Sequence, residues 1–315
     1  MSTRLIESPG SAVPSGRRGT GSADILLAAS LWGTTGTVRT LAPSGADPVS
    51  VGAARIVLGG AVLLAVAALI RGRDGSSARG EGLRRLLSQR RRWWLLAFGA
   101  VCAAVYQCAF FAAVARTGVA TGTVVTIGSA PAFTGLIALM TRGPRPSWRW
   151  TVATACAVVG CAALVGGGRS AGVEPFGVAL ALLSGLAYAV YATIASHLIS
   201  RGEDDRAVAA TLFGLAAVLL LPVLVAGSPG WLLSPSGALV TAYLGVITTA
   251  GAYLLYARGL RGTPVTTATT LTLAEPAVAA VLGLLVLDER LGGVALAGLG
   301  LLSVGLVLLI LAGRR

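Results

Sequence analysis

Residues 261–276 read RGTPVTTATTLTLAEP, and residues 116–131 read RTGVATGTVVTIGSAP. The two stretches align without a gap at an offset of 145 residues. Both begin with Arg and end with Pro, at Pro131 and Pro276. Self-similarity at a fixed spacing indicates a duplicated unit. We therefore expect the chain to consist of two related halves.

The composition of the chain indicates that its solvent is lipid. Of its 315 residues, 55% are hydrophobic and 12% are charged, and the mean hydropathy is +0.81. A helix that crosses the hydrocarbon core of a bilayer needs about 20 apolar residues. Approximately ten such segments can be read along the sequence. We expect them at residues 22–40, 48–70, 93–115, 119–140, 149–168, 174–199, 207–227, 237–257, 264–287 and 291–312.

Five spans in each half reverse the second copy, because an odd number of crossings changes the side from which the next copy starts. The predicted fold is an all-α integral membrane protein with ten transmembrane helices as two inverted five-helix repeats. We place the first repeat at residues 22–170 and the second at residues 171–315. Residues 1–21 are rich in Ser, Pro and Gly and are expected to form a disordered cytoplasmic tail.

The arginines predict the orientation, since all 25 basic residues are Arg. With a cytoplasmic N-terminus, 20 of them fall in the tail, the cytoplasmic loops and the C-terminus, and four fall in outside loops. The positive-inside rule then predicts a multi-pass protein of the cytoplasmic membrane with both termini in the cytoplasm. The cluster at 71–94 is expected to rest on anionic lipid headgroups. The net charge of +13 does not indicate nucleic acid, because the charges flank the spans.

Two longer stretches carry a family resemblance. Residues 31–65, LWGTTGTVRTLAPSGADPVSVGAARIVLGGAVLLA, and residues 272–309, TLAEPAVAAVLGLLVLDERLGGVALAGLGLLSVGLVLL, resemble the two repeats of the EamA family in the drug/metabolite transporter superfamily. The residues that carry it are Trp32, Gly33, Arg55, Pro131, Pro276 and Glu289.

The resemblance implies ten helices, cytoplasmic termini, and export or uptake of small metabolites. One position departs from the family pattern, because Pro144 stands where the first half usually has an acid that corresponds to Glu289. An acid at that position is therefore not expected to be essential to transport in the first half.

Glu275 is the charged residue that the ninth segment places in an apolar run. It lies roughly twelve residues, or about 18 Å, from either end of residues 264–287. A charge at the bilayer centre costs about 2.5–3.5 kcal/mol on insertion scales, so the carboxyl group must face a cavity, find a partner or stay protonated. Two interpretations remain open. Glu275 is either the coupling residue that carries a proton, or a neutral acid that bonds carbonyls freed by Pro276.

Aromatic and hydroxyl side chains recur at helical spacing and are expected to share faces that converge on a solute cavity. We predict that this cavity is lined by Trp32, Thr35, Tyr106, Phe110, Thr126, Tyr188, Tyr191, Tyr253, Thr267 and Thr272. Pro131 and Pro276 are predicted hinges. The alternative for each aromatic residue is ordinary packing or, as for Tyr256, an interfacial belt. Arg55 lies about seven residues into its segment and is expected toward the outer surface, where it can line the vestibule.

These features favour a secondary transporter that moves a small organic metabolite or drug-like solute by alternating access, as an exporter. Coupling to protons is an open alternative. The competing functions are an integral-membrane enzyme and a lipid or solute facilitator without ion coupling. The sequence has no nucleophile elbow, ligand-spaced His/Cys cluster or Walker motif, so we expect no catalysis, metal site or cofactor. The sequence leaves the oligomeric state open and is compatible with a monomer.

Overall fold

A computed structural model describes residues 18–43, 45–69, 80–141, 147–166, 174–286 and 292–313, and all regular elements within these ranges are helical. In chain order they are α1 (Arg18–Gly33), α2 (Thr35–Arg39), α3 (Pro48–Leu69), α4 (Glu81–Ser88), η2 (Arg90–Arg92), α5 (Trp93–Met140), α6 (Trp148–Gly166), α7 (Pro175–Ser200), α8 (Asp205–Ala226), η3 (Pro229–Leu233), α9 (Pro235–Ala242), η4 (Tyr243–Gly251), α10 (Ala252–Gly259), α11 (Val265–Leu271), α12 (Ala274–Val286) and α13 (Gly293–Gly313).

Within this described part of the chain, eight segments are long and apolar enough to cross a membrane, and Trp148–Leu164 is a shorter apolar helix. The first expected span, at 22–40, is not among the eight. α1 has only 16 residues, and the chain turns at Thr34 before α2 begins. α1 also starts at Arg18, so the last residues assigned to the disordered tail are helical. The other expected spans each coincide with one of these segments to within a few residues at either end.

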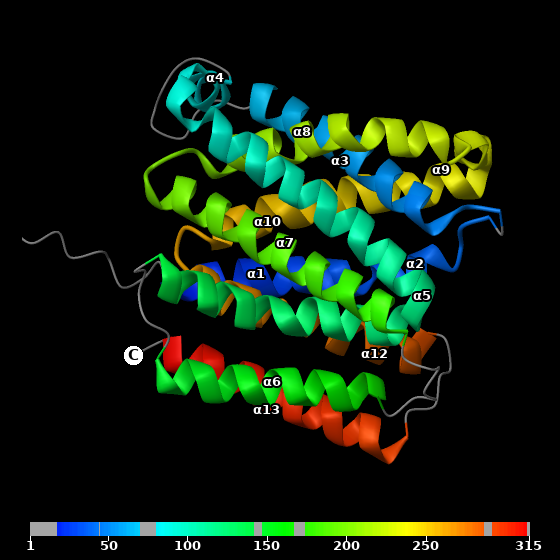
Figure 1. The fold of residues 1–315 in the computed structure, drawn as a ribbon, viewed down its shortest axis with the longest axis vertical. Coiled ribbons are helices and arrows are strands. Elements are labelled where there is room, and N and C mark those ends of the chain that lie inside the picture. The colour runs from blue at the N-terminus through cyan, green and yellow to red at the C-terminus, as the bar shows by residue number, and fades with distance from the viewer. Residues whose placement is uncertain are drawn as a thin grey trace, which may run out of the picture.

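Two of the spans, Trp93–Thr117 and Gly122–Met140, lie within α5. A Cβ atom added at Gly122 would lie 3.1 Å from the backbone nitrogen of Val114, eight residues earlier. Eight residues of a straight helix extend about 12 Å, so the chain reverses direction between the two spans. Figure 1 shows this reversal of α5.

The helices pack in a small number of extensive pairs. α1 contacts α10 and α12. α7 contacts both spans of α5, through one hydrogen bond that involves Tyr106 in the first span and another that involves Thr126 in the second. α3 packs on α8, and α6 packs on α13 at one edge of the bundle (Figure 1). Large apolar side chains such as Leu136, Val218 and Leu308 remain exposed on the outside, as a lipid-facing surface requires.

The ninth span is broken between α11 and α12, at Thr272 and Leu273, just before the predicted hinge at Pro276. Pro276 has no N–H group to bond the carbonyl of Thr272, four residues earlier. That carbonyl instead accepts a hydrogen bond of 3.0 Å from the backbone N–H of Glu275. The eighth span is also irregular, because its centre, η4, is a π-helix. Pro131, by contrast, lies within the second span of α5, where the helix is not interrupted.

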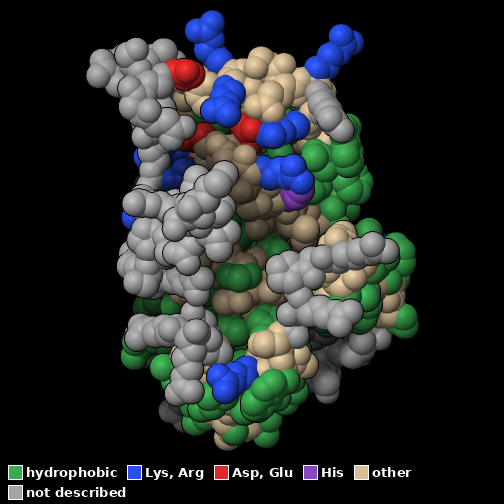
Figure 2. Space-filling model, turned by 90° about the vertical axis from the view of Figure 1, so that its left-hand side faces the viewer, with side chains coloured by type: hydrophobic (Ala, Val, Ile, Leu, Met, Phe, Trp, Pro, Cys, Tyr) green, Lys and Arg blue, Asp and Glu red, His purple; other side chains and the backbone are tan. Residues whose placement is uncertain are grey.

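Arginine side chains gather at the end of the bundle to which α1 and α13 bring the two termini (Figure 2). Ion pairs tie the chain together there: Arg92 pairs with Glu203, and Arg258 pairs with Asp24 at 3.1 Å. The opposite end contains Arg116, which pairs with Glu174 at 2.8 Å. This distribution of described arginines agrees with the asymmetry of the sequence.

We predict that Gly298→Val destabilises the contact between α6 and α13. A Cβ atom at Gly298 would lie 2.7 Å from the carbonyl oxygen of Gly160, where no side chain can yield. Overpacking of this kind costs about 1–3 kcal/mol, so the midpoint of thermal unfolding in detergent should fall. Gly300→Val is the matched control, because nothing lies within 4 Å of that position. Equal midpoints for the two variants would refute the close packing.

Candidate functional site

A narrow cavity lies in the middle of the bundle, at the break between α11 and α12. The centre of a water molecule can occupy about 10 Å³ of this cavity. That is room for roughly one water molecule. The lining residues come equally from the two halves of the chain: Trp32, Tyr106, Thr126 and Ile127 from the first, and Tyr188, Tyr253, Thr272 and Glu275 from the second.

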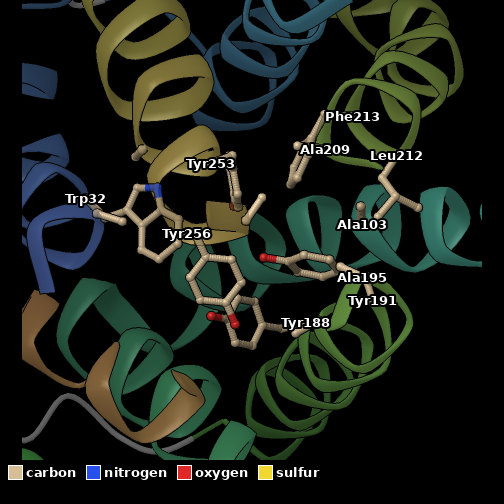
Figure 3. Close-up of a cluster of buried hydrophobic side chains, with 14 of the residues drawn as sticks. Trp32, Ala103, Tyr188, Tyr191, Ala195, Ala209, Leu212, Phe213, Tyr253 and Tyr256 are labelled. Atoms are coloured by element: carbon tan, nitrogen blue, oxygen red, sulfur yellow. The ribbon is translucent and has the colours of Figure 1, made fainter. Parts of the chain in front are cut away.

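Four of the eight lining residues are aromatic, and Figure 3 shows three of them, Trp32, Tyr188 and Tyr253, within a larger cluster of buried side chains. The ring of Trp32 lies 5.0 Å from that of Tyr253 and 5.6 Å from that of Tyr256, and the ring of Tyr106 lies 5.3 Å from that of Tyr188. The indole N–H of Trp32 donates a hydrogen bond of 2.8 Å to the carbonyl of Thr248 in η4. These contacts join helices of the first half to helices of the second.

Three tyrosine hydroxyls in this cluster are buried without a hydrogen bond of normal geometry to any described residue, and they belong to Tyr188, Tyr191 and Tyr256. Figure 3 shows these hydroxyls turned toward the centre of the cluster. Buried hydroxyls normally have partners, and one left without a partner destabilises the fold. Of the three residues, Tyr188 lines the cavity, so its hydroxyl is the one that a solute or water there can reach.

Glu275 lies in the first turn of α12 and faces the cavity. No hydrogen bond or ion pair joins its carboxylate to a residue in the described part of the chain. The guanidinium of Arg55 nevertheless acts on it electrostatically. The backbone N–H of Glu275 already satisfies the carbonyl freed by Pro276. The carbonyl of Thr272 therefore has a partner other than the carboxyl group of Glu275.

Gly33 allows α1 to approach Glu275 closely. A Cβ atom at Gly33 would lie 2.8 Å from the carbonyl oxygen of Glu275 and 2.8 Å from the Cβ atom of Val278. The Trp-Gly pair of the first segment thus has two functions. Trp32 lines the cavity, and Gly33 brings the helix that carries Trp32 against the helix that carries Glu275.

The cavity brings together most of the residues predicted from the sequence: Trp32, Tyr106, Thr126, Tyr188, Tyr253, Thr272 and Glu275. Four others do not line it. The ring of Tyr191 packs 5.1 Å from that of Tyr188, and the ring of Phe110 lies 6.4 Å from that of Tyr106. Thr35 has a buried hydroxyl without a hydrogen-bond partner among the described residues, and Thr267 is partly buried on α11.

Sequence reasoning missed three features of the site. Tyr256 is only 2% exposed and its ring lies 5.6 Å from that of Trp32, so it belongs to the aromatic cluster although the sequence analysis did not include it. Its spacing of three residues from Tyr253 was the signal for a shared face. Arg55 is only 7% exposed, so other helices enclose its side chain, while Ile127 gave no signal beyond its position next to Thr126.

The neighbouring threonines of α11 serve packing. The hydroxyl of Thr269 lies 2.9 Å from that of Thr134, and the hydroxyl of Thr270 lies 3.0 Å from that of Thr154. Small polar residues join membrane helices in this way. This arrangement attaches α11 to both α5 and α6.

Comparison with known proteins gives a consistent result. The model of the EamA-like transporter family matches residues 20–166 and again residues 175–311. The chain is 37% identical over 291 residues to the uncharacterized transporter YwfM of Bacillus subtilis, covering 92% of this chain and 94% of YwfM. An uncharacterized transporter of Clostridium kluyveri is 28% identical over 46% of this chain and 45% of its own. A crystal structure with 20% identity superposes with a TM-score of 0.75 and covers 95% of this chain and 99% of its own.

Proposed function

Because the chain belongs to the EamA-like transporter family, within the drug/metabolite transporter superfamily, we propose that it moves small amphipathic organic solutes by alternating access. The family match and the transporter named as its relative support a transporter function. The single observation that carries our proposal is the cavity at Glu275, which four residues from each half of the chain enclose. Transporters built from repeats bind their solutes at such an interface, beside interrupted helices.

The proposed architecture is two inverted five-helix repeats, at residues 22–170 and 171–315. The double match of the family model supports it. The helix pairs support it too, because a two-fold axis in the membrane plane relates the contact of α1 with α10 to that of α7 with the first span of α5. The same axis would pair α3 with α8 and α6 with α13, as observed.

The size of the cavity supports alternating access. Its capacity of roughly one water molecule is far below the 300–1,000 Å³ of a usual small-molecule site. A solute can therefore enter only if the two halves separate on one side. The break before α12 and the π-helix η4 are places where the backbone can adjust at low cost.

We propose that Glu275 carries the coupling proton. The groups around it are Arg55 and the hydroxyls of Tyr106 and Tyr253, and no described carboxylate competes with it inside the cavity. If a proton and a solute occupy the cavity in turn, the inward proton gradient of a cell drives the solute outward. Export is therefore the direction that we propose for the cytoplasmic membrane.

The arginine-rich end is placed in the cytoplasm in this proposal, with both termini. Exposed side chains of Arg84, Arg85 and Arg90 lie on α4 and η2 beside the exposed ring of Trp94, an arrangement that suits contact with anionic headgroups. Nothing in the site requires a second subunit, so we propose that a monomer is sufficient.

Transport by purified protein in vesicles tests the function. Vesicles with an acidic lumen should accumulate at least one compound from a panel of labelled aromatic amines, alcohols and carboxylates, because protons leave in exchange. Collapse of the gradient with an ionophore should stop accumulation. A panel that equilibrates without accumulating would favour the facilitator, and conversion of a compound would favour the enzyme.

A further inference from the structure

Arg55 is a buried cation without a role of its own in the proposed transport mechanism. Its side chain is only 7% exposed, and its Nε atom has no hydrogen-bond partner among the described residues. It forms no ion pair with a described carboxylate. A cation in this position destabilises the membrane-embedded fold unless it finds an anion or a ring of acceptors.

The packing of α3 directs Arg55 into the bundle. Gly52 and Gly59 lie three residues before it and four after it, so all three share one helix face. That face is pressed against its neighbours, since a Cβ atom at Gly59 would lie 2.6 Å from the Cβ atom of Thr249, and one at Gly52 would overlap the ring of Phe111. Arg55 is therefore enclosed between α5 and η4 and cannot reach the lipid surface by extending outward.

The surroundings of Arg55 include the cavity wall. Its guanidinium interacts with the hydroxyl of Tyr253 and acts electrostatically on Tyr106 and Glu275, all three of which line the cavity. The cavity thus has a cation behind one part of its wall and a carboxyl group on another part. A solute with an anionic end and an aromatic or apolar body matches this arrangement.

We propose that Arg55 is the anion-binding group of the solute site and takes the carboxylate of a small aromatic or apolar solute. This inference rests on the proposed transport function. The planar guanidinium offers parallel N–H donors that match the two oxygens of a carboxylate. A small movement of Tyr253 on solute entry opens the path from the cavity to these donors.

The charge balance selects a carboxylate over other groups. An ionised Glu275 repels a doubly charged phosphate about twice as strongly as a carboxylate, while Arg55 offers either group the same single positive charge. An organic cation would be repelled by Arg55 and attracted only by the carboxylate of Glu275. The other end of the solute faces Glu275, where a hydroxyl or another donor can replace the proton during exchange.

Four probes that share one aromatic body test the inference by calorimetry on protein in lipid nanodiscs. They are 3-phenyllactate, the corresponding diol, the corresponding amino alcohol and the phosphate ester of the diol. The native protein should bind the carboxylate at least about tenfold more tightly than the diol. Arg55→Gln should remove this preference and leave the affinity for the diol within about twofold. Arg55→Lys should keep part of the preference for the carboxylate, because lysine retains the positive charge but lacks the two parallel N–H donors of the guanidinium.

Three results would overturn the inference: no preference for the carboxylate in the native protein, tighter binding of the phosphate or the amine, or an equal loss for every probe in Arg55→Gln. The last would indicate a structural role alone. Transport in vesicles separates this inference from the function. Carboxylate binding that depends on Arg55, without transport of any probe, would leave the inference standing and refute the transport proposal. Transport of the diol or the amine but not of the carboxylate would support the transport proposal and refute the inference.

Discussion

Replacement of Glu275 with Gln will reduce gradient-driven accumulation in vesicles to the level of vesicles without protein. Glutamine has the shape of the protonated acid and can form similar hydrogen bonds, but it cannot release a proton. The variant should therefore still fold and still exchange labelled for unlabelled solute across the membrane. It should no longer convert a proton gradient into a solute gradient. The measurement is accumulation of the transported probe with an acidic lumen, beside counterflow at equal pH.

Glu81→Gln is the matched control, because Glu81 is an exposed acid on α4, outside the bundle. It should accumulate solute as the native protein does. If Glu275→Gln also accumulates solute normally, Glu275 does not carry the coupling proton. If the variant loses counterflow together with accumulation, its carboxyl group serves binding or folding.

Gly33→Val will abolish both accumulation and counterflow. The valine side chain would occupy the position where the backbone of Glu275 and the side chain of Val278 lie, each 2.8 Å from the new Cβ atom. α1 must then move away from α12, and Trp32 moves with it out of the aromatic wall. Overpacking of this kind costs about 1–3 kcal/mol of stability, and the displaced cavity wall adds a loss of binding.

Gly36→Val is the control for Gly33→Val, since Gly36 lies only three residues later and a Cβ atom added there would have nothing within 4 Å. Transport and the midpoint of thermal unfolding should both remain near the native values in that variant. Native transport by Gly33→Val would show that the contact between α1 and α12 does not shape the site.

Helical spacing in the sequence located most of the cavity. Tyr188 and Tyr253 lie on faces that the positions of the aromatic residues already defined, and Glu275 is conspicuous as a charge in an apolar run. A periodic pattern of this kind identifies a face even when the neighbouring helix is unknown. The alignment of the two stretches that end at Pro131 and Pro276 then indicated that helices of both halves meet there.

Three-dimensional packing decided what the sequence left open. The two prolines are equivalent in the alignment, yet the chain is broken only before Pro276, where Thr272 and Leu273 carry no turn signal. Arg55 was placed by counting residues from a helix end, which ignores that Gly52 and Gly59 press its face against other helices. Linear distance predicts depth in the membrane but not the direction of a side chain.

Accessibility of the cavity from the two sides of the membrane tests the central claim most directly. Thr126 lines the cavity and is 1% exposed. We would place a cysteine there after replacing Cys102, Cys108, Cys156 and Cys161 with Ala, and confirm transport. Thr134→Cys serves as the control, because Thr134 lies on the same helix, is equally buried and contacts Thr269 outside the cavity.

If the cavity opens alternately to each side, a small membrane-impermeant thiosulfonate will modify the cysteine at position 126 when added to either side. Saturating transported solute will slow the reaction, and the cysteine at position 134 will remain unmodified. A transporting Thr126→Cys protein that reacts from neither side, or that reacts at the same rate with and without solute, would contradict the assignment of this cavity as the transport site.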